Sequence, residues 1–148
     1  MKFGGSKIEI YINASLDEVK ESAKEDRKCL AQYEVTPSEE YKTGKARRLS
    51  PKNCYQKAFE YVSAKRDIEG IKLVHGLYRP SFFDNHCGHA WVDLPNQIIF
   101  DGVLQLFYDK EGYYDFYQIV KQREYNSSEM NRIRKENGGH YGPWHDND

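Results

Sequence analysis

At 148 residues the chain has the length of one domain, which would bury roughly 68–70% of its unfolded surface in a single core. Charged residues make up 30% of the sequence and nearly cancel at a net charge of −1, so we expect neither nucleic acid nor membrane as a partner. No apolar run reaches the ~18 residues of a membrane-spanning helix, and we find no secretory signal. Three cysteines cannot close a disulfide framework, so we expect free thiols and a cytoplasmic location.

The first part of the chain predicts a short strand, a long helix and a long loop. Residues 7–12 alternate apolar and polar side chains, which indicates a strand. Ser15 to Glu18 has the spacing of a capping box, and apolar residues at helical intervals then predict a helix over 16–33. Residues 37–49 follow a Thr-Pro pair and have no periodicity, so we expect a loop of the kind that often carries functional residues.

A second helix is predicted to begin close to Cys54. Ser50 stands where an N-cap is expected, and Pro51 stands at the first helical position. Apolar residues then recur at three- and four-residue steps, which places Cys54 on or beside the buried face, in the first turn or just after it. Because a helix N-terminus stabilises a thiolate, Cys54 is either a reactive nucleophile or an inert, buried thiol.

A β-hairpin is predicted over residues 86–101, with a histidine and an aspartate on its two arms. If the loop is three residues long, over 94–96, His89 faces Asp101 on the same side of the sheet, and opposed Cβ atoms are about 4.5–5.5 Å apart. A two-residue turn would instead pair His89 with Gly102 and direct Asp101 to the opposite face. An interaction between the two side chains therefore requires a loop with an odd number of residues.

The remaining segments are assigned from periodicity and from turn residues. In chain order they are a strand over 71–78, a turn at 109–112, a helix over 114–125, a helix over 127–136 that Asn137-Gly138-Gly139 ends, and a polar tail over 140–148. The second strand of the hairpin is expected to continue through Leu106 or Phe107. We expect the tail to be loosely held, apart from Trp144.

Cys54 at a helix start, His89 on a strand and Asp101 on the next strand provide the parts of a thiol acyl-transfer site. These parts are a nucleophile, a base that takes its proton, and a carboxylate that fixes the tautomer of the base. The segments that carry this pattern resemble the core of the transglutaminase-like branch of the papain-like cysteine peptidase superfamily; they are Asn53-Cys54-Tyr55, Gly88-His89-Ala90-Trp91-Val92-Asp93 and Phe100-Asp101. One departure is that the Asp is often followed by Pro-Thr in that branch, and here by Gly102-Val103.

The resemblance implies a fold as well as a site. It implies an α+β, papain-like or transglutaminase-like fold, in which a helical part carrying Cys54 packs on a small antiparallel sheet carrying His89 and Asp101. A single domain over 1–148 is expected, with a catalytic core at about 50–107. Residue by residue, the resemblance implies that Cys54 is the nucleophile, His89 the general base and acid, and Asp101 the carboxylate that orients His89.

We therefore expect a cysteine-dependent acyl-transfer enzyme that needs no cofactor or metal. Hydrolysis of an amide bond through a thioester intermediate, as in a thiol peptidase or deamidase, is the first expectation because water is always present; a transglutaminase or acyltransferase shares this chemistry and transfers the acyl group to an amine instead. The substrate would be a protein or peptide, or a small amide or thioester. The backbone N–H of Cys54 is one donor for the oxyanion, and candidates for a second are Asn53, Gln56, a polar group from the loop that ends at Ser50 and, more remotely, Gln32.

Two other classes of function compete with this interpretation. The first is a small metal-binding protein, since four permissible ligands lie within six residues: Asp84, His86, Cys87 and His89. The spacing is poor for structural zinc, and only His140 and His145 in the tail are left to complete such a site. The second is a non-catalytic binding module that has kept the fold without the chemistry.

Overall fold

In a computed structural model, which describes residues 15–43, 49–50 and 53–144, the chain is α+β. The strand predicted over residues 7–12 lies outside these ranges. The described elements are α2 (Leu16–Leu30), the 3₁₀ turns η1 (Ala31–Tyr33) and η2 (Glu39–Tyr41), α3 (Cys54–Ala64), β1 (Lys72–Tyr78), β2 (Cys87–Leu94), β3 (Ile98–Asp101), β4 (Leu106–Asp109), α4 (Lys110–Tyr117), β5 (Val120–Tyr125) and α5 (Ser127–Glu136).

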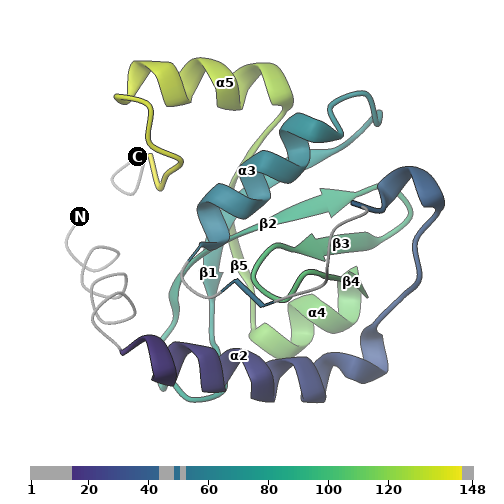
Figure 1. Cartoon of the computed structure of the whole chain (residues 1–148), viewed down its shortest axis with the longest axis vertical. Coiled ribbons are helices and arrows are strands. Elements are labelled where there is room, and N and C mark those ends of the chain that lie inside the picture. Colours follow the sequence, from purple (N-terminus) through teal and green to yellow (C-terminus); the bar gives the residue numbers. More distant parts are fainter. Residues whose placement is uncertain (1–14, 44–48, 51–52, 145–148) are drawn as a thin grey trace.

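The strands form one antiparallel sheet in the order β4-β3-β2-β1-β5. In the orientation of Figure 1, α3 and α5 lie above the sheet, and α2 and α4 lie below it. The two faces have separate buried clusters. Ala58 and Val62 of α3 share one cluster with Val92 and Phe100, whereas Val19 of α2 belongs to the other. An antiparallel sheet covered on both faces explains why every residue of β2 is buried.

The predicted helix over 16–33 is confirmed. α2 begins with the expected capping box, in which the Ser15 hydroxyl accepts from the Glu18 N–H and the Glu18 carboxylate accepts from the Ser15 N–H. The helix continues as the 3₁₀ turn that ends at Tyr33. Nowhere in the described part of the chain is there a helix both long and apolar enough to cross a membrane.

The start of α3 differs from the prediction. The helix begins at Cys54 with Asn53 in the N-cap position, so Ser50 is not the N-cap. The Ser50 C=O instead accepts from the Asn53 N–H, and the Ser50 N–H donates to the Val103 C=O at 2.8 Å. Pro51, predicted at the first helical position, lies outside the described residues. Cys54 is nevertheless buried in the first turn, as the helical periodicity predicted.

The loop of the predicted hairpin is displaced by one residue, which shifts the pairing register of its two strands by two residues. β2 and β3 pair as Leu94↔Ile98 and Val92↔Phe100, so the loop is Pro95-Asn96-Gln97 and the predicted loop over 94–96 is wrong. Asn96 and Gln97 both have positive φ angles, 64° and 61°, which close this loop. Continued by one step, the register sets Asp101 opposite Trp91 rather than His89. The loop still has three residues, so His89 and Asp101 remain on one face, as diagonal rather than direct neighbours.

The second hairpin strand is shorter than predicted. It ends at Asp101, and a new strand, β4, begins at Leu106. The Asp101 carboxylate accepts two backbone N–H groups of the intervening segment, and Gln105 takes a positive φ of 59°. These hydrogen bonds from the side chain to the backbone stabilise a turn after Asp101, so β3 does not continue to pair with β2.

The helix predicted over 114–125 is correct only in its first part. α4 begins earlier, at Lys110, because Asp109 caps it by accepting from the Gly112 N–H at 2.9 Å; the turn predicted at 109–112 is therefore the start of the helix. Gln118 adopts the left-handed conformation, with φ 51° and ψ 51°, and ends it. The following residues form the edge strand β5, which pairs with β1. Tertiary pairing thus overrides the helical pattern there.

The strand predicted over 71–78 and the final helix are confirmed as β1 and α5. The described part of the tail is less loose than predicted. Trp144 is buried, as expected, but the Tyr141 ring also packs, with the Arg134 guanidinium 4.3 Å from its centroid. The Trp144 indole N–H donates to the His140 C=O at 2.9 Å, so residues 140–144 form an ordered turn against α3 and α5.

Candidate active site

Cys54 lies at the start of α3, which packs close to the end of β3. β3 pairs only with the Val92–Leu94 part of β2. α3 packs against the turn that follows β3, and a Cβ atom on Gly102 would lie 2.5 Å from the Cβ of Lys57. The glycine that follows Asp101, which departs from the pattern of the resembled family, therefore permits this close approach. As a result, Cys54 joins the buried cluster that contains Trp91.

His89 is held between aromatic rings. It is 1% exposed, and its ring stacks on that of Tyr78 from β1, with centroids 3.8 Å apart and planes at 8°. The Trp91 ring lies 5.7 Å away on the same face of β2. Ring stacking leaves the imidazole little freedom to rotate, so the directions of its two nitrogens are fixed by the fold.

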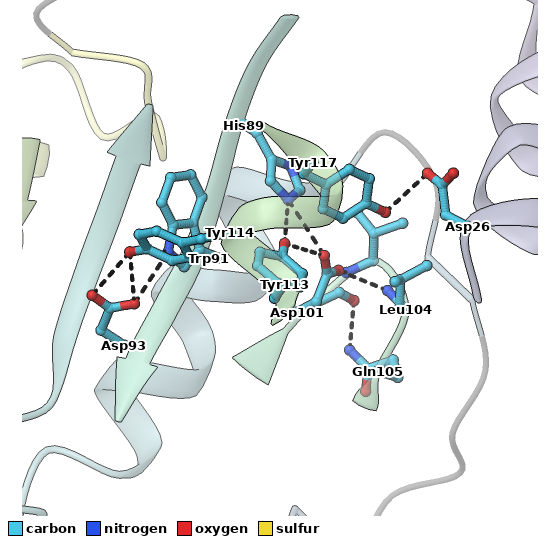
Figure 2. A network of polar contacts seen from close by, with 12 residues as sticks. Asp26, His89, Trp91, Asp93, Asp101, Leu104, Gln105, Tyr113, Tyr114 and Tyr117 are labelled. Carbon is cyan, nitrogen blue, oxygen red and sulfur yellow. Dashed lines mark hydrogen bonds and ion pairs between the residues drawn. The ribbon is translucent and has the colours of Figure 1, made fainter. Parts of the chain in front are cut away.

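The Nε2 atom of His89 faces two oxygen atoms, as Figure 2 shows. One is Oδ2 of Asp101 at 3.4 Å, and the other is the hydroxyl oxygen of Tyr113 at 3.0 Å. The Tyr113 hydroxyl donates to the same Oδ2 atom at 2.5 Å. Since a carboxylate can only accept, Nε2 carries its proton toward this pair of oxygens.

The other oxygen of Asp101 is held by the backbone. Oδ1 accepts from the Val103 N–H at 2.8 Å and from the Leu104 N–H at 2.9 Å. Burial alone raises the pKa of Asp101, but His89, Tyr113 and the Leu104 N–H outweigh burial and hold that pKa below its ordinary value. Asp101 is therefore an anion over the whole neutral range.

Cys54 is a second neighbour of His89 and contributes to the pKa of its ring. Nδ1 of His89 is buried and makes no hydrogen bond of ordinary geometry with the described residues, so it is the ring nitrogen left to face the thiol. Burial lowers the pKa of His89, whereas Asp101 and Cys54 raise it, and the net effect is a pKa of about 9. The positive charge on the imidazole is thus stabilised by both neighbouring groups.

A second buried carboxylate lies close to this group. Asp26 of α2 accepts from the backbone N–H and the hydroxyl of Ser81, and from the Tyr117 hydroxyl at 2.9 Å. Burial raises its pKa to about 6 against the opposing effect of these hydrogen bonds, and the charge of Asp101 adds to the rise. Figure 2 shows Tyr117 directed from the His89 side toward Asp26.

Among the described residues, the side chains predicted as a second oxyanion donor have other partners or are exposed. The Gln56 amide donates to Glu60 at 3.0 Å, and the Gln32 amide donates to the Cys29 C=O within its own helix. Asn53 is exposed, and its side chain does not cap α3. The N–H of Cys54 itself has no helical partner, because it belongs to the first turn.

The residues of the metal alternative are dispersed. His86 Nε2 lies 2.8 Å from the Gln118 C=O, the Cys87 thiol donates to the Asn85 C=O at 3.6 Å, and His89 faces Asp101. Over residues 15–43, 49–50 and 53–144, no three His, Cys, Asp or Glu side chains lie together as a metal ion would require.

Sequence reasoning missed two residues of this site, Tyr113 and Tyr78. Tyr113 lies outside the predicted catalytic core at 50–107 and just before the helix predicted to begin at 114. An earlier helix start could have been read from Asp109, whose side chain caps α4. For Tyr78 the signal was its position in a strand that precedes the hairpin, but stacking on His89 depends on register.

The chain was compared with protein-family models, with curated proteins and with solved structures. It matches no family model, no curated protein and no solved structure. The candidate site is therefore supported by its own geometry, namely the convergence of Cys54, His89, Asp101 and Tyr113 from four different elements.

Proposed function

We propose that this protein is a cysteine-dependent acyl-transfer enzyme of papain-like or transglutaminase-like fold, which hydrolyses an amide bond of a peptide, a protein or a small amide. The observation that carries the proposal is that the two ring nitrogens of His89 have different surroundings. Its Nε2 faces a carboxylate and a phenol, and its buried Nδ1 is left for Cys54. The three thiols are free, as a cytoplasmic enzyme would require.

The chemistry begins with an ion pair. His89 holds the proton of Cys54 on Nδ1, and the thiolate attacks the carbonyl carbon of the substrate, forming a C–S bond. The tetrahedral intermediate collapses as the C–N bond breaks, and His89 gives its proton to the departing nitrogen. Water then attacks the thioester while Nδ1 takes a proton from it, and cleavage of the C–S bond releases the acid and restores the thiolate.

Two parts of the fold favour this sequence of steps. The N-terminus of α3 offers the Cys54 N–H and the positive end of the helix dipole to the developing oxyanion. Asp101 stays ionised, because its other oxygen is held by two backbone N–H groups, and so stabilises the imidazolium without taking its proton.

The first test is selective alkylation by iodoacetamide at pH 6, followed by peptide mass spectrometry. Cys54 should be labelled at least about tenfold faster than the other two cysteines, because a thiolate reacts and a thiol does not. Burial and the neighbouring Glu25 raise the pKa of Cys29, and Cys87 is fully buried, so both serve as internal standards.

The second test asks for the covalent intermediate. Incubation with p-nitrophenyl acetate should acetylate Cys54 and then release acetate with turnover, and Cys54→Ala should abolish both steps. Cys29→Ala is the matched control and should leave both steps unchanged. Equal labelling of all three cysteines, together with no acyl adduct, would favour a binding module that carries the motif without the chemistry.

A further inference from the structure

Tyr113 is placed between the two groups whose interaction the proposed chemistry needs. The direct distance from His89 Nε2 to Asp101 Oδ2 is 3.4 Å, which is long for a charge-assisted hydrogen bond. Tyr113 closes this gap, because its oxygen lies 3.0 Å from Nε2 and 2.5 Å from Oδ2. Each of the two hydrogen bonds that join the imidazole to the carboxylate through the phenol is therefore shorter than the direct contact.

The direction of these hydrogen bonds follows from the chemistry of the groups. A tyrosine hydroxyl has one hydrogen, which goes to the carboxylate because Asp101 has none to give. The same oxygen must then accept from Nε2–H of His89. Burial and the Asp101 charge hold the pKa of Tyr113 well above its ordinary value, so the hydroxyl keeps this hydrogen at all working pH values.

The tyrosine is itself firmly positioned. It is completely buried in the first turn of α4, next to Gly112, where a Cβ atom would lie 2.2 Å from the ring of Tyr33. Its ring lies against those of Tyr108 and Tyr117, with centroids 5.8 and 5.0 Å away. A hydroxyl held in this way can set the orientation of a neighbouring imidazole rather than follow it.

We infer that Tyr113 is a positioning residue of the site: it keeps the imidazole proton on Nε2 and so presents Nδ1 of His89 to Cys54. The inference rests on the proposed function only for its effect on Cys54 reactivity; the effect on the tautomer is independent of any activity. Titratable groups from every element packed around the ring enter the balance: Cys54 of α3, Tyr78 of β1, Asp101 of β3, Tyr113 and Tyr117 of α4, and Asp26 of α2 through Asp101.

The test compares Tyr113→Phe with Tyr117→Phe in the full chain. Both variants remove one buried hydroxyl from α4, but the Tyr117 hydroxyl donates to Asp26 and not to His89. ¹⁵N spectra of histidine-labelled protein, with the His89 signals assigned by their loss in His89→Gln, report which ring nitrogens carry a proton. Wild type and Tyr117→Phe should show His89 protonated at Nε2 from pH 6 to 10, whereas above pH 9 Tyr113→Phe should show a mixture of tautomers.

The second readout is the pH profile of Cys54 alkylation. In Tyr113→Phe the rate at pH 6 should fall about tenfold, the factor that a hydrogen bond to a charged group is worth, and the profile should shift to higher pH. An unchanged tautomer and an unchanged profile in a folded Tyr113→Phe protein would overturn the inference. If that variant does not fold, a wild-type His89 protonated at Nδ1 alone above pH 9 overturns it equally. Slow alkylation of Cys54 in wild type would instead contradict the proposed function and leave the tautomer result standing.

Discussion

Two carboxylates on the same hairpin are bound by consecutive tyrosines of α4, yet their surroundings differ (Figure 2). Asp93 accepts from the Tyr114 hydroxyl at 3.1 Å and lies 3.2 and 3.4 Å from the ammonium groups of Lys110 and Lys121. Asp101 accepts from Tyr113, and the cation that it faces is the imidazole of His89. Its pair is also more deeply buried, with both side chains 1% exposed.

The difference shows which carboxylate is suited to chemistry. A lysine is charged at any physiological pH, so the positive charge near Asp93 is constant. The ion pairs of Asp93 with Lys110 and Lys121 therefore connect β2 to α4 and β5. An imidazole can gain and lose a proton, and the pKa of His89 is about 9, far below that of a lysine, so the charge beside Asp101 can change during a reaction. The same local pattern of carboxylate and tyrosine therefore forms a structural link at one end of β2 and a candidate reaction site toward the other.

The largest expected effect separates these two carboxylates directly. Asp101→Asn should slow Cys54 alkylation at pH 6 on the order of 100-fold, because the imidazolium that supports the thiolate loses its anion and each pKa unit is a factor of ten. Asp93→Asn removes the same charge beside lysines and should leave the rate within about twofold. Equal losses in the two variants would show that Asp101 has no special role.

The next effect concerns stability at alkaline pH. Because Asp101 and Cys54 raise the pKa of His89 to about 9 in the folded protein, against burial, the stability from this interaction is complete below the unfolded pKa of ~6.5. It is lost as pH rises through 9, by on the order of 3 kcal/mol. Thermal denaturation of wild type should therefore show a melting temperature that falls from pH 6.5 to 9, and His89→Gln should remove most of that fall.

Asp26 extends the comparison to a carboxylate whose three hydrogen-bond donors are neutral groups. Since burial raises its pKa to about 6, the folded state binds the proton more tightly than the unfolded state, and stability falls as pH rises from about 4 to 6. Asp26→Asn, which is neutral at every pH, should flatten the melting temperature in this window. If the melting temperature of wild type rose from pH 4 to 6 relative to that of Asp26→Asn, the assignment of a raised pKa to Asp26 would be contradicted.

The smallest expected effect is the response to chelation. His86 and Cys87 are directed to separate backbone carbonyls, so we expect less than one zinc per purified chain and a melting temperature unchanged by a chelator. One tightly bound zinc per chain that is lost in both His86→Ala and Cys87→Ala would contradict the proposed enzyme and favour the metal-binding alternative.

The sequence by itself determined the local parts of this protein. The capping box at Ser15 predicts where α2 begins, and the periodicity after Cys54 predicts the buried face of α3, because both signals are formed by residues within one or two turns. The odd length of the hairpin loop was sufficient to keep His89 and Asp101 on one face, since side chains alternate with a period of two.

The tertiary structure decided what depends on contacts between distant segments. Residues 120–125 form a strand rather than a helix because the edge of β1 offers them backbone partners, which local periodicity does not reveal. Register within the hairpin was set by the left-handed residues Asn96 and Gln97, not by the apolar pattern. Tyr113 enters the site because α4 packs beneath the sheet, where its buried hydroxyl finds an acceptor in Asp101. The contact between α4 and Asp101 depends on tertiary packing, so no spacing in the sequence predicts it.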